Sequence, residues 1–451
     1  MRADASILAR KLSSLVGEEY VLTGPAAARF AVDEAEPALA VRPGSQQEVS
    51  TVAAACSAAG ASMLPWTDEA QISLGNPPRR LEVVVCLDRL TRIVEFDDAN
   101  LNVSVEAGVR LDALQAVLSA KREFLPLDPA QSDQVTVGGL VQTNASGPSR
   151  QLYGSLRDWV LGLRVVLPGG ERIRSGGKVI KNVSGYDMNK IFIGNLGTLG
   201  IVTEATFKLL PAPAMRATVV GVFGHLSEVR SAVGRTLESF LLPEALEALD
   251  PQALAALGPA LGLEGAPGYG LAVSMAGSRE TVERQVRDFT ALFGENKATK
   301  VETLGAERAD TAWRAVRDVH AKLPAGRVIA KIAVPIGTTL DLFSAAEELM
   351  HRHEWRGAIT AHAGSGIVRA GIEVGAGSAL EPLREALLSL RREAEDLDGS
   401  LVLEAAPLSL KRSLETWGRV REGFSVMRRL KAELDPGALL TPGRFLGGIC
   451  R

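Results

Sequence analysis

The chain lacks long apolar runs, large net charge and abundant cysteine, and each shortage excludes a class of protein. No run of about 18 apolar residues occurs, so the sequence predicts no transmembrane helix and no direct membrane insertion. The formal net charge of -3 gives bulk electrostatics no role in binding nucleic acid or an anionic membrane. Three cysteines, Cys56, Cys86 and Cys450, are too few and too scattered for an iron–sulfur cluster or a cysteine zinc site.

The remaining composition is that of an ordinary globular protein. Hydrophobic residues make up 46% and charged residues 23% of the 451 residues, which is enough for two large domains with normal cores. The N-terminal stretch MRADASILARKLSSLVGEEY is amphipathic and lacks the unbroken apolar segment of a signal peptide. These features predict a cytoplasmic protein, which would reach a membrane only through partner proteins.

Hydrophobic periodicity divides the chain at the Pro-rich segment LLPAPA, residues 209–214. Before it, the patterns predict helices at 47–60 and 111–121 and strands at 81–87, 92–97 and 101–108. After it, strands alternate with helices. The strands are predicted at 219–224, 270–277, 329–336 and 400–405, with a pair in AITAHAG and IVRAGIEV, and the helices at 226–240, 278–294, 338–350, 380–394 and most of 411–433. The second half therefore reads as an α+β domain with antiparallel strand pairs covered by helices.

A first glycine motif, TVGGLVQTNASG, spans residues 136–147. Gly138 and Gly139 let a ligand approach the backbone without a Cβ in the way, and consecutive amides in such a turn suit a pyrophosphate. Thr143, Asn144 and Ser146 add hydrogen-bonding groups. The structural alternative is a glycine-rich turn that binds nothing.

A second motif, GNLGTLGIVTEA, places Gly194, Gly197 and Gly200 at intervals of three before an apolar strand. This arrangement suits a flat ring system lying close to the backbone. The two motifs together, about 50 residues apart, are a more specific signal than either one alone.

The chain resembles the FAD-linked oxidases of the vanillyl-alcohol oxidase (PCMH-type) superfamily. The resemblance rests on TVGGLVQTNASGPSRQLYGSLRD, KVIKNVSGYD and GNLGTLGIVTEA, and further on HAGSGIVRAG (362–371), LVLEAAP (401–407) and LDPGALLTPGRFLGGI (434–449). Within this superfamily the chain is most similar to the smaller flavoprotein-like subunit of glycolate oxidase, a glycolate or D-lactate dehydrogenase.

The resemblance implies an α+β fold in three parts. A PCMH-type FAD-binding domain would span 1–212, a ferredoxin-like α+β capping domain that forms the substrate pocket would span 213–436, and a tail, 437–451, would return to the first domain. The implied cofactor is FAD. The residues implied to bind it are Gly138, Gly139, Thr143, Asn144, Ser146, Gly147, Gly154, Gly197, Gly200 and Ile201.

The chain departs from the family at the first pyrophosphate loop. The family reads roughly GGGTKLSWGNPP there, whereas this chain reads TDEAQISLGNPP, so that Thr67, Asp68 and Glu69 align with three glycines. Side chains then fill the space of the cradle, and like charges ~4 Å apart cost on the order of 1–4 kcal/mol. Two outcomes stay open: the loop rearranges and still holds FAD, or it forms a polar surface turn.

A second departure concerns the catalytic histidines. Catalytic relatives carry HAGDGNLH and EHG, whose histidines bind a metal and take the substrate proton. Here Arg369 replaces the second histidine of the first pattern, and Glu404 is followed by two alanines, so the sequence predicts no metal site. His362 as base and Arg369 as carboxylate ligand form one hypothesis. The alternative is a structural His362 and an Arg369–Glu404 ion pair.

The other basic residues of the second half carry less specific signals. Arg314 and Arg317 suit either an anion site or a solvated helix face. His320, His351 and His353 lie on expected helices without a spacing partner, and the HRHE segment at 351–354 is predicted to be surface.

Three functional hypotheses follow from the resemblance. The chain is an accessory or electron-relay subunit, beside a catalytic flavoprotein subunit and an iron–sulfur subunit. Alternatively it is an autonomous FAD-dependent dehydrogenase of a small 2-hydroxy acid that uses His362 and Arg369, or a flavin-free scaffold subunit.

Overall fold

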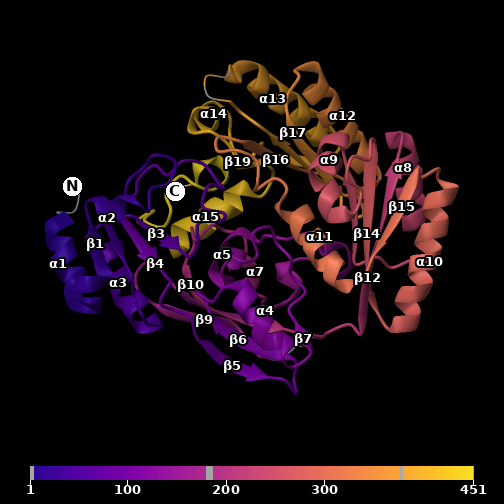
Figure 1. Cartoon of the computed structure of the whole chain (residues 1–451). Helices are drawn as coiled ribbons and strands as arrows, with labels where there is room; N and C mark the ends of the chain where they lie inside the picture. The colour runs from indigo at the N-terminus through magenta and orange to yellow at the C-terminus, as the bar shows by residue number, and fades with distance from the viewer. Residues whose placement is uncertain (1–4, 179–185, 376, 378, 450–451) are drawn as a thin grey trace.

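The computed structural model describes residues 5–178, 186–375, 377 and 379–449. Most of the KVIKNVSGYD motif and Cys450 lie outside these residues. The chain forms two α+β lobes, and its C-terminal segment crosses back from the second lobe to the first (Figure 1). Within the described ranges, no helix is both long enough and apolar enough to span a bilayer.

The first lobe contains two main sheets. The first has the order β1-β2-β4-β3, in which β2, β4 and β3 run parallel, and the second is antiparallel with the order β5-β6-β10-β8-β9. The strands are β1 (Val21–Thr23), β2 (Leu39–Val41), β3 (Met63–Trp66), β4 (Val83–Cys86), β5 (Ile93–Asp97), β6 (Asn102–Glu106), β8 (Val160–Val166), β9 (Arg172–Gly176) and β10 (Ile201–Lys208), and β7 (Glu123–Phe124) pairs with β11 (Leu210–Pro211).

Helices surround these sheets. They are α1 (Ala5–Val16), α2 (Pro25–Ala28), α3 (Gln46–Ala58), α4 (Leu111–Ser119), α5 (Val137–Thr143), α6 (Arg150–Tyr153) and α7 (Asn189–Phe192). Local signals explain α3, because the Ser45 side chain accepts a hydrogen bond from the Glu48 N–H at its start and Gly60 follows its end.

The second lobe is built on an eight-stranded antiparallel sheet with the order β15-β12-β14-β13-β17-β18-β16-β19. The strands are β12 (Met215–Phe223), β13 (Ala245–Leu249), β14 (Tyr269–Gly277), β15 (Lys300–Leu304), β16 (Val328–Ala333), β17 (Gly357–His362), β18 (Ile367–Ile372) and β19 (Ser400–Ala405). The helices are α8 (Leu226–Leu237), α9 (Pro251–Leu261), α10 (Arg279–Glu295), α11 (Ala306–Asp318), α12 (Thr339–Arg352), α13 (Leu380–Asp396), α14 (Leu408–Ser413) and α15 (Phe424–Leu434).

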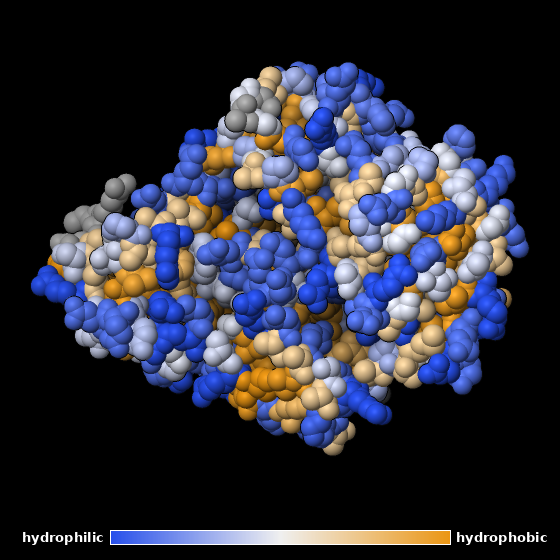
Figure 2. All heavy atoms as spheres, in the orientation of Figure 1, coloured by the Kyte–Doolittle hydropathy of each residue, from blue (hydrophilic) through white to orange (hydrophobic). Residues whose placement is uncertain are grey.

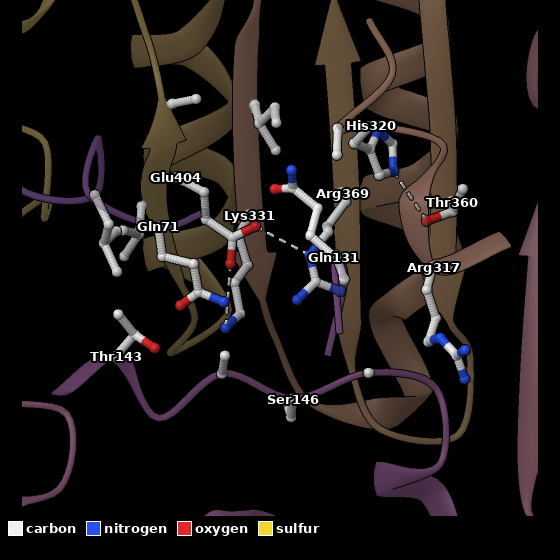
Figure 3. Close-up of a pocket in the computed structure, with 18 of the residues that line it drawn as sticks. Gln71, Gln131, Thr143, Ser146, Arg317, His320, Lys331, Thr360, Arg369 and Glu404 are labelled. Atoms are coloured by element: carbon white, nitrogen blue, oxygen red, sulfur yellow. Dashed lines mark hydrogen bonds and ion pairs between the residues drawn. The ribbon is translucent and has the colours of Figure 1, made fainter. Parts of the chain in front are cut away.

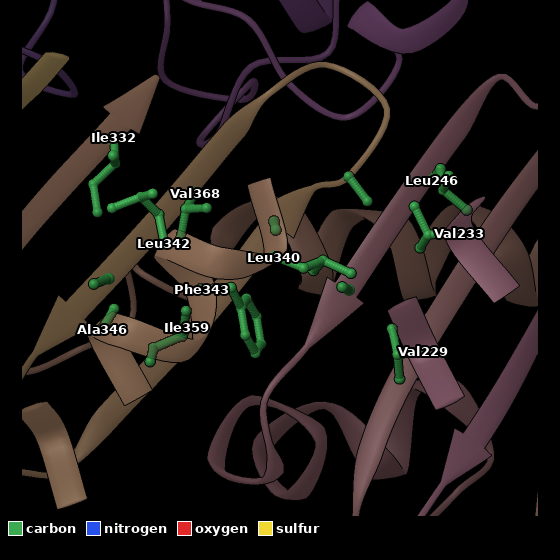
Figure 4. Packing of buried hydrophobic residues seen from close by; sticks show 14 of the residues in the cluster. Val229, Val233, Leu246, Ile332, Leu340, Leu342, Phe343, Ala346, Ile359 and Val368 are labelled. Carbon is green, nitrogen blue, oxygen red and sulfur yellow. The ribbon is translucent and has the colours of Figure 1, made fainter. Parts of the chain in front are cut away.

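The two faces of this sheet have different partners. One face buries the largest apolar core under α8, α10, α12 and α13, with Phe343 of α12 against Ile359 and Val368 of the sheet (Figure 4). The opposite face is covered by α9 and α11 at one end. Because side chains alternate along a strand, Ile332 and Val368 on the apolar face place their neighbours Lys331 and Arg369 on the other face, toward the first lobe.

The face of the molecule seen in Figure 2 is mainly hydrophilic, with hydrophobic residues in separate patches over both lobes. The return of the chain to the first lobe begins before the expected residue 437. Leu430 and Leu434 of α15 already pack against the first lobe's core. Most of the segment 411–433 is helical, as predicted, but it forms two helices: residues 414–423 separate α14 from α15, and Gly418 and Gly423 adopt left-handed φ angles of 83° and 88° there.

Candidate functional site

A cavity of about 330 Å³ lies where the first lobe meets the polar face of the second lobe's sheet. The strand register builds one wall, because Thr360 of β17 pairs with Arg369 of β18, which pairs with Lys331 of β16. Glu404 of β19 and Arg317 and His320 from the end of α11 border this row, and the first lobe contributes Gln71, Gln131, Thr143 and Ser146 (Figure 3).

Arg369 is the centre of the polar wall. Its Nε donates to Glu404 Oε2 at 3.0 Å, and its guanidinium also donates to His362 Nε2 at 2.6 Å. Lys331 Nζ lies 3.6 Å from Glu404 Oε1. Burial alone would raise the pKa of Glu404, but Arg369 and Lys331 lower it to about 2, so this carboxylate is ionised at neutral pH. The ion pair between Arg369 and Glu404 that the sequence left as an alternative is present.

His362 is buried with both ring nitrogens engaged. Its Nδ1 lies 2.5 Å from Glu247 Oε2 on the neighbouring strand β13. An arginine cannot give up its proton, so Nε2 is the acceptor of the Arg369 bond and Nδ1–H donates to Glu247. In this arrangement His362 has no free lone pair with which to take a proton from a ligand. The two predicted catalytic residues, His362 and Arg369, are therefore in contact, and the hydrogen bond between them uses the His362 nitrogen that would otherwise accept a proton.

Arg317 has a different location from the one that the sequence favoured, and His320 lies in the turn after α11 instead of on the expected helix. His320 is only 6% exposed and its Nε2 lies 3.2 Å from Thr360 Oγ1. Burial lowers the pKa of His320 to about 3, so the ring is neutral. Arg317 is not on a solvated face, because its guanidinium lies 3.8 Å from Asp128 Oδ2 across the two lobes. The HRHE segment at 351–354 is exposed, as predicted.

Helix α5 organises the first glycine motif. The Thr136 side chain accepts a hydrogen bond from the Gly139 N–H at the start of the helix, and Asn144 ends it with φ 52°. Gly138 and Gly139 lie in its first turn. Of this motif, Thr143, Ala145, Ser146 and Gly147 line the large cavity, whereas Gly138, Gly139 and Asn144 do not.

The second set of predicted cofactor residues lies apart from that cavity. Gly154 ends α6 with φ 77°, and Gly197, with φ 69°, packs against Pro65. Gly200 packs closely against Val165, and Ile201 lies in the apolar core of the first lobe. None of these four residues lines the interlobe cavity. Their contact with a cofactor remains a prediction.

The place expected for the FAD pyrophosphate is filled by the chain itself. The Asp68 Oδ2 atom accepts hydrogen bonds from the Thr136 N–H at 3.0 Å and from the Thr136 hydroxyl at 2.9 Å. A Cβ added at Gly139 would collide with the Asp68 carboxylate, and one at Gly138 would lie 2.5 Å from Thr67 Cγ2. The side chains at 67 and 68 thus occupy the space that glycines would leave open.

The space left beside Asp68 is small. A cavity of about 20 Å³ remains, bordered by Gln142, Thr441 and Arg444, each of which has a buried polar atom without a hydrogen-bond partner. Such a volume holds about one water molecule. With the loop arranged in this way, the residues do not fit the pyrophosphate of FAD.

The polar wall also offers no evident metal site. Within the described ranges, no three His, Cys, Asp or Glu side chains come together closely enough to hold a metal ion. The Arg369 guanidinium lies between His362 and Glu404, where it places a fixed positive charge.

Comparisons with known proteins agree with the sequence motifs. The family described as FAD binding domain matches residues 37–176, and the family described as FAD linked oxidases, C-terminal domain, matches residues 212–445. Glycolate oxidase subunit GlcD of Bacillus subtilis is 29% identical over 92% of this chain and 90% of its own length. The cytochrome D-lactate dehydrogenase of Arabidopsis thaliana mitochondria is 25% identical over 91% of this chain and 73% of its own length.

Two further matches concern the expected subunit type and fold. Glycolate oxidase subunit GlcE of Escherichia coli is 38% identical, but over only 27% of this chain and 35% of its own length. The solved structure of p-cresol methylhydroxylase matches with a TM-score of 0.77 at 16% identity, over 98% of this chain and 97% of that one, which confirms the predicted α+β PCMH-type fold. With a family match over more than half of its length, the chain belongs to the FAD-linked oxidases.

Proposed function

We propose that this chain is an accessory subunit of an FAD-dependent 2-hydroxy acid dehydrogenase complex acting on glycolate or D-lactate. The observation that carries the proposal is that both ring nitrogens of His362 already have hydrogen-bond partners, Glu247 and Arg369. A subunit without a free base and with a filled pyrophosphate cradle contributes an interface and a binding pocket, while a catalytic flavoprotein subunit and an iron–sulfur subunit carry the electrons.

The similarity to known enzymes supports the assembly. One relative is named as a subunit of glycolate oxidase and another as a D-lactate dehydrogenase. The similarity to GlcD spans nearly the whole chain, whereas the similarity to GlcE spans only a part of it. These similarities do not favour an accessory subunit over a catalytic one, so the proposed accessory role rests on the geometry of the site.

The interlobe cavity suits a small organic acid. Four cationic side chains line it against two acidic ones, Glu247 and Glu404, which leaves an excess of positive charge; the cations are Arg317, Arg327, Lys331 and Arg369. A cavity of about 330 Å³ lies at the lower end of the range for small-molecule sites. A ligand carboxylate would bind the Arg369 fork and Lys331.

The same cavity favours a second candidate, an autonomous dehydrogenase. A substrate carboxylate that takes Arg369 away from His362 would release the Nε2 lone pair, and His362 would then accept the proton of the substrate's hydroxyl group. This reading requires the chain to hold a redox cofactor by itself, which the arrangement of Asp68 opposes.

Activity of the isolated chain and of the native complex separates the two candidates. We expect the purified chain with added FAD to reduce no dye acceptor with glycolate or D-lactate, while the complex isolated through a tag on this chain reduces it and contains flavin and iron. Turnover by the isolated chain would reject the accessory role. A tagged chain that brings down no flavoprotein subunit and no iron would reject the complex.

A further inference from the structure

The loop that carries Asp68 is held in place by buried charges. Arg444, 3% exposed, donates to the carbonyl groups of Ile72 at 2.6 Å and Leu74 at 2.5 Å. Lys411, 4% exposed, donates to Asp33 at 2.8 Å and to the Ser73 carbonyl at 2.5 Å. Buried charges therefore tie down this loop, in which residues 67, 68 and 70–74 are half-buried and Glu69 is exposed.

Asp68 satisfies the donors that a bound phosphate would otherwise meet. Thr136 is 5% exposed, so its N–H and hydroxyl need an acceptor inside the protein. The Thr136 hydroxyl links Gly139 to Asp68, because it accepts a hydrogen bond from the Gly139 N–H and donates one to the Asp68 carboxylate. Burial raises the pKa of the Asp68 carboxyl, and the Thr136 bonds and the backbone N–H groups of Ala70 and Gln71 act in the opposite direction.

We infer that Asp68 is a built-in substitute for the cofactor phosphate, so that this chain completes its FAD-type fold without FAD. The carboxylate supplies the negative charge and the acceptor atoms of a phosphate, and the Thr67 side chain closes the cradle over Gly138. The neighbouring carboxylate Glu69 is exposed and takes no part. This inference concerns folding of the chain itself and does not depend on the complex or on its 2-hydroxy acid.

Thermal unfolding of the full chain tests the inference, with FAD and inorganic pyrophosphate as probes. We expect the wild-type chain to purify without flavin absorption and to show no change in Tm with either probe. In Asp68→Gly the Tm should fall by about 2–4 °C or more, because Thr136 loses its acceptor, and pyrophosphate should raise it again because the cradle is open.

The matched control is Glu69→Gly, which removes the adjacent exposed carboxylate. It should leave the Tm nearly unchanged and should create no response to pyrophosphate. A triple variant with glycine at 67, 68 and 69 then tests the cofactor: it should gain a Tm increase with FAD that the wild type lacks.

Two results would overturn the inference. One is a wild-type chain that purifies with about one flavin per chain, or whose Tm rises with FAD; this measurement stands even if a variant fails to fold. The other is an Asp68→Gly chain that folds and shows no response to pyrophosphate, because the cradle would then not be an anion site. Loss of the complex with these results intact would reject the proposed function alone.

Discussion

At the scale of single residues, Arg369 decides what the site can do. A histidine at this position would leave His362 and Glu404 as partners for a cation, whereas the guanidinium is itself the cation and pairs with both. The planar guanidinium donates hydrogen bonds in two fixed directions, one toward Glu404 and one toward His362, and a lysine ammonium lacks this fixed geometry. The residue therefore places a fixed positive charge between His362 and Glu404, and under the proposed function this charge binds the substrate carboxylate.

Binding of small acids should depend on Arg369. In Arg369→Met, affinity for glycolate or D-lactate should fall about tenfold or more, because a charge-assisted hydrogen bond contributes on the order of 1.5–3 kcal/mol. Isothermal titration calorimetry of the full chain measures this. Arg314→Met, on the exposed side of α11, is the control and should bind as the wild type does. Equal affinity in both variants would place the ligand elsewhere.

His320 should make the protein less stable in mild acid. Its pKa in the folded chain is about 3, below the value of about 6.5 in the unfolded chain, so the unfolded state binds the proton more readily. The stabilisation is complete above pH 6.5 and is lost as the pH falls toward 3. Between pH 7 and 5 the free energy of unfolding should decrease by about 2 kcal/mol from this residue.

Urea denaturation at pH 7 and 5 measures that loss. His320→Gln should reduce the difference between the two pH values, because glutamine does not titrate. His351→Gln, at an exposed histidine of α12 that lies 3.9 Å from Glu347, is the comparison variant and should change the difference less than His320→Gln does. An unchanged pH dependence in His320→Gln would contradict the assignment.

At the scale of elements, the pairing of strands β17, β18 and β16 builds the polar wall. A shift of one residue in this register would move Arg369 and Lys331 to the apolar face. The polar wall also requires a glycine at position 371, next to the His320 ring. A Cβ at Gly371 of β18 would lie 2.5 Å from His320 Nδ1 and 2.6 Å from Leu323 Cδ1, so the glycine makes room for the histidine ring.

Gly371→Ala should displace His320 and damage the cavity. We expect a loss of stability of about 1–3 kcal/mol from overpacking, together with weaker binding of glycolate. Gly234→Ala in α8 is the control, because apart from its chain neighbours and the nearby backbone of its own helix no atom lies within 4 Å of the added methyl group. It should be neutral or slightly stabilising. The two variants are compared by urea denaturation and by calorimetry, and wild-type binding by Gly371→Ala would show that His320 does not shape the site.

At the scale of the whole molecule, a buried ammonium group anchors the C-terminal segment to the first lobe. Lys431 Nζ donates to Asp435 Oδ2 at 2.6 Å, to the Thr198 carbonyl at 2.7 Å and to the Leu440 carbonyl at 3.0 Å. Leu440 also forms a parallel bridge with Met63 at the edge of β3. One ammonium group thus fixes the returning chain onto the first lobe.

Removal of that ammonium group should be strongly destabilising. Lys431→Met leaves Asp435 buried without its cation and should cost on the order of 3–5 kcal/mol. Addition of Asp435→Asn should recover part of this, because the unpaired charge is gone. Urea denaturation of the two single variants and the double variant completes the cycle. Strictly additive effects would mean that the two side chains do not stabilise each other.

The sequence by itself determined the element pattern and the family of this protein. Alternating and helical periodicity marked most strands and helices, and the spacing of glycine motifs pointed to the FAD-linked oxidases, because these signals are local. Only the tertiary structure decided the rest. The segment ALEAL became the central strand β13 against its helical propensity, since β14 and β17 pair with it on both sides.

The chemistry of the site likewise depends on contacts that only the tertiary structure creates. Asp68 turns inward to Thr136, 68 positions away in the sequence, and Arg369 meets Glu404 because strands β18, β16 and β19 lie side by side. Burial of His320 depends on packing of the turn after α11 against strands β17 and β18, which no local pattern encodes. Contacts between residues distant in the sequence arise from register and packing, so the sequence could nominate these residues but not their partners.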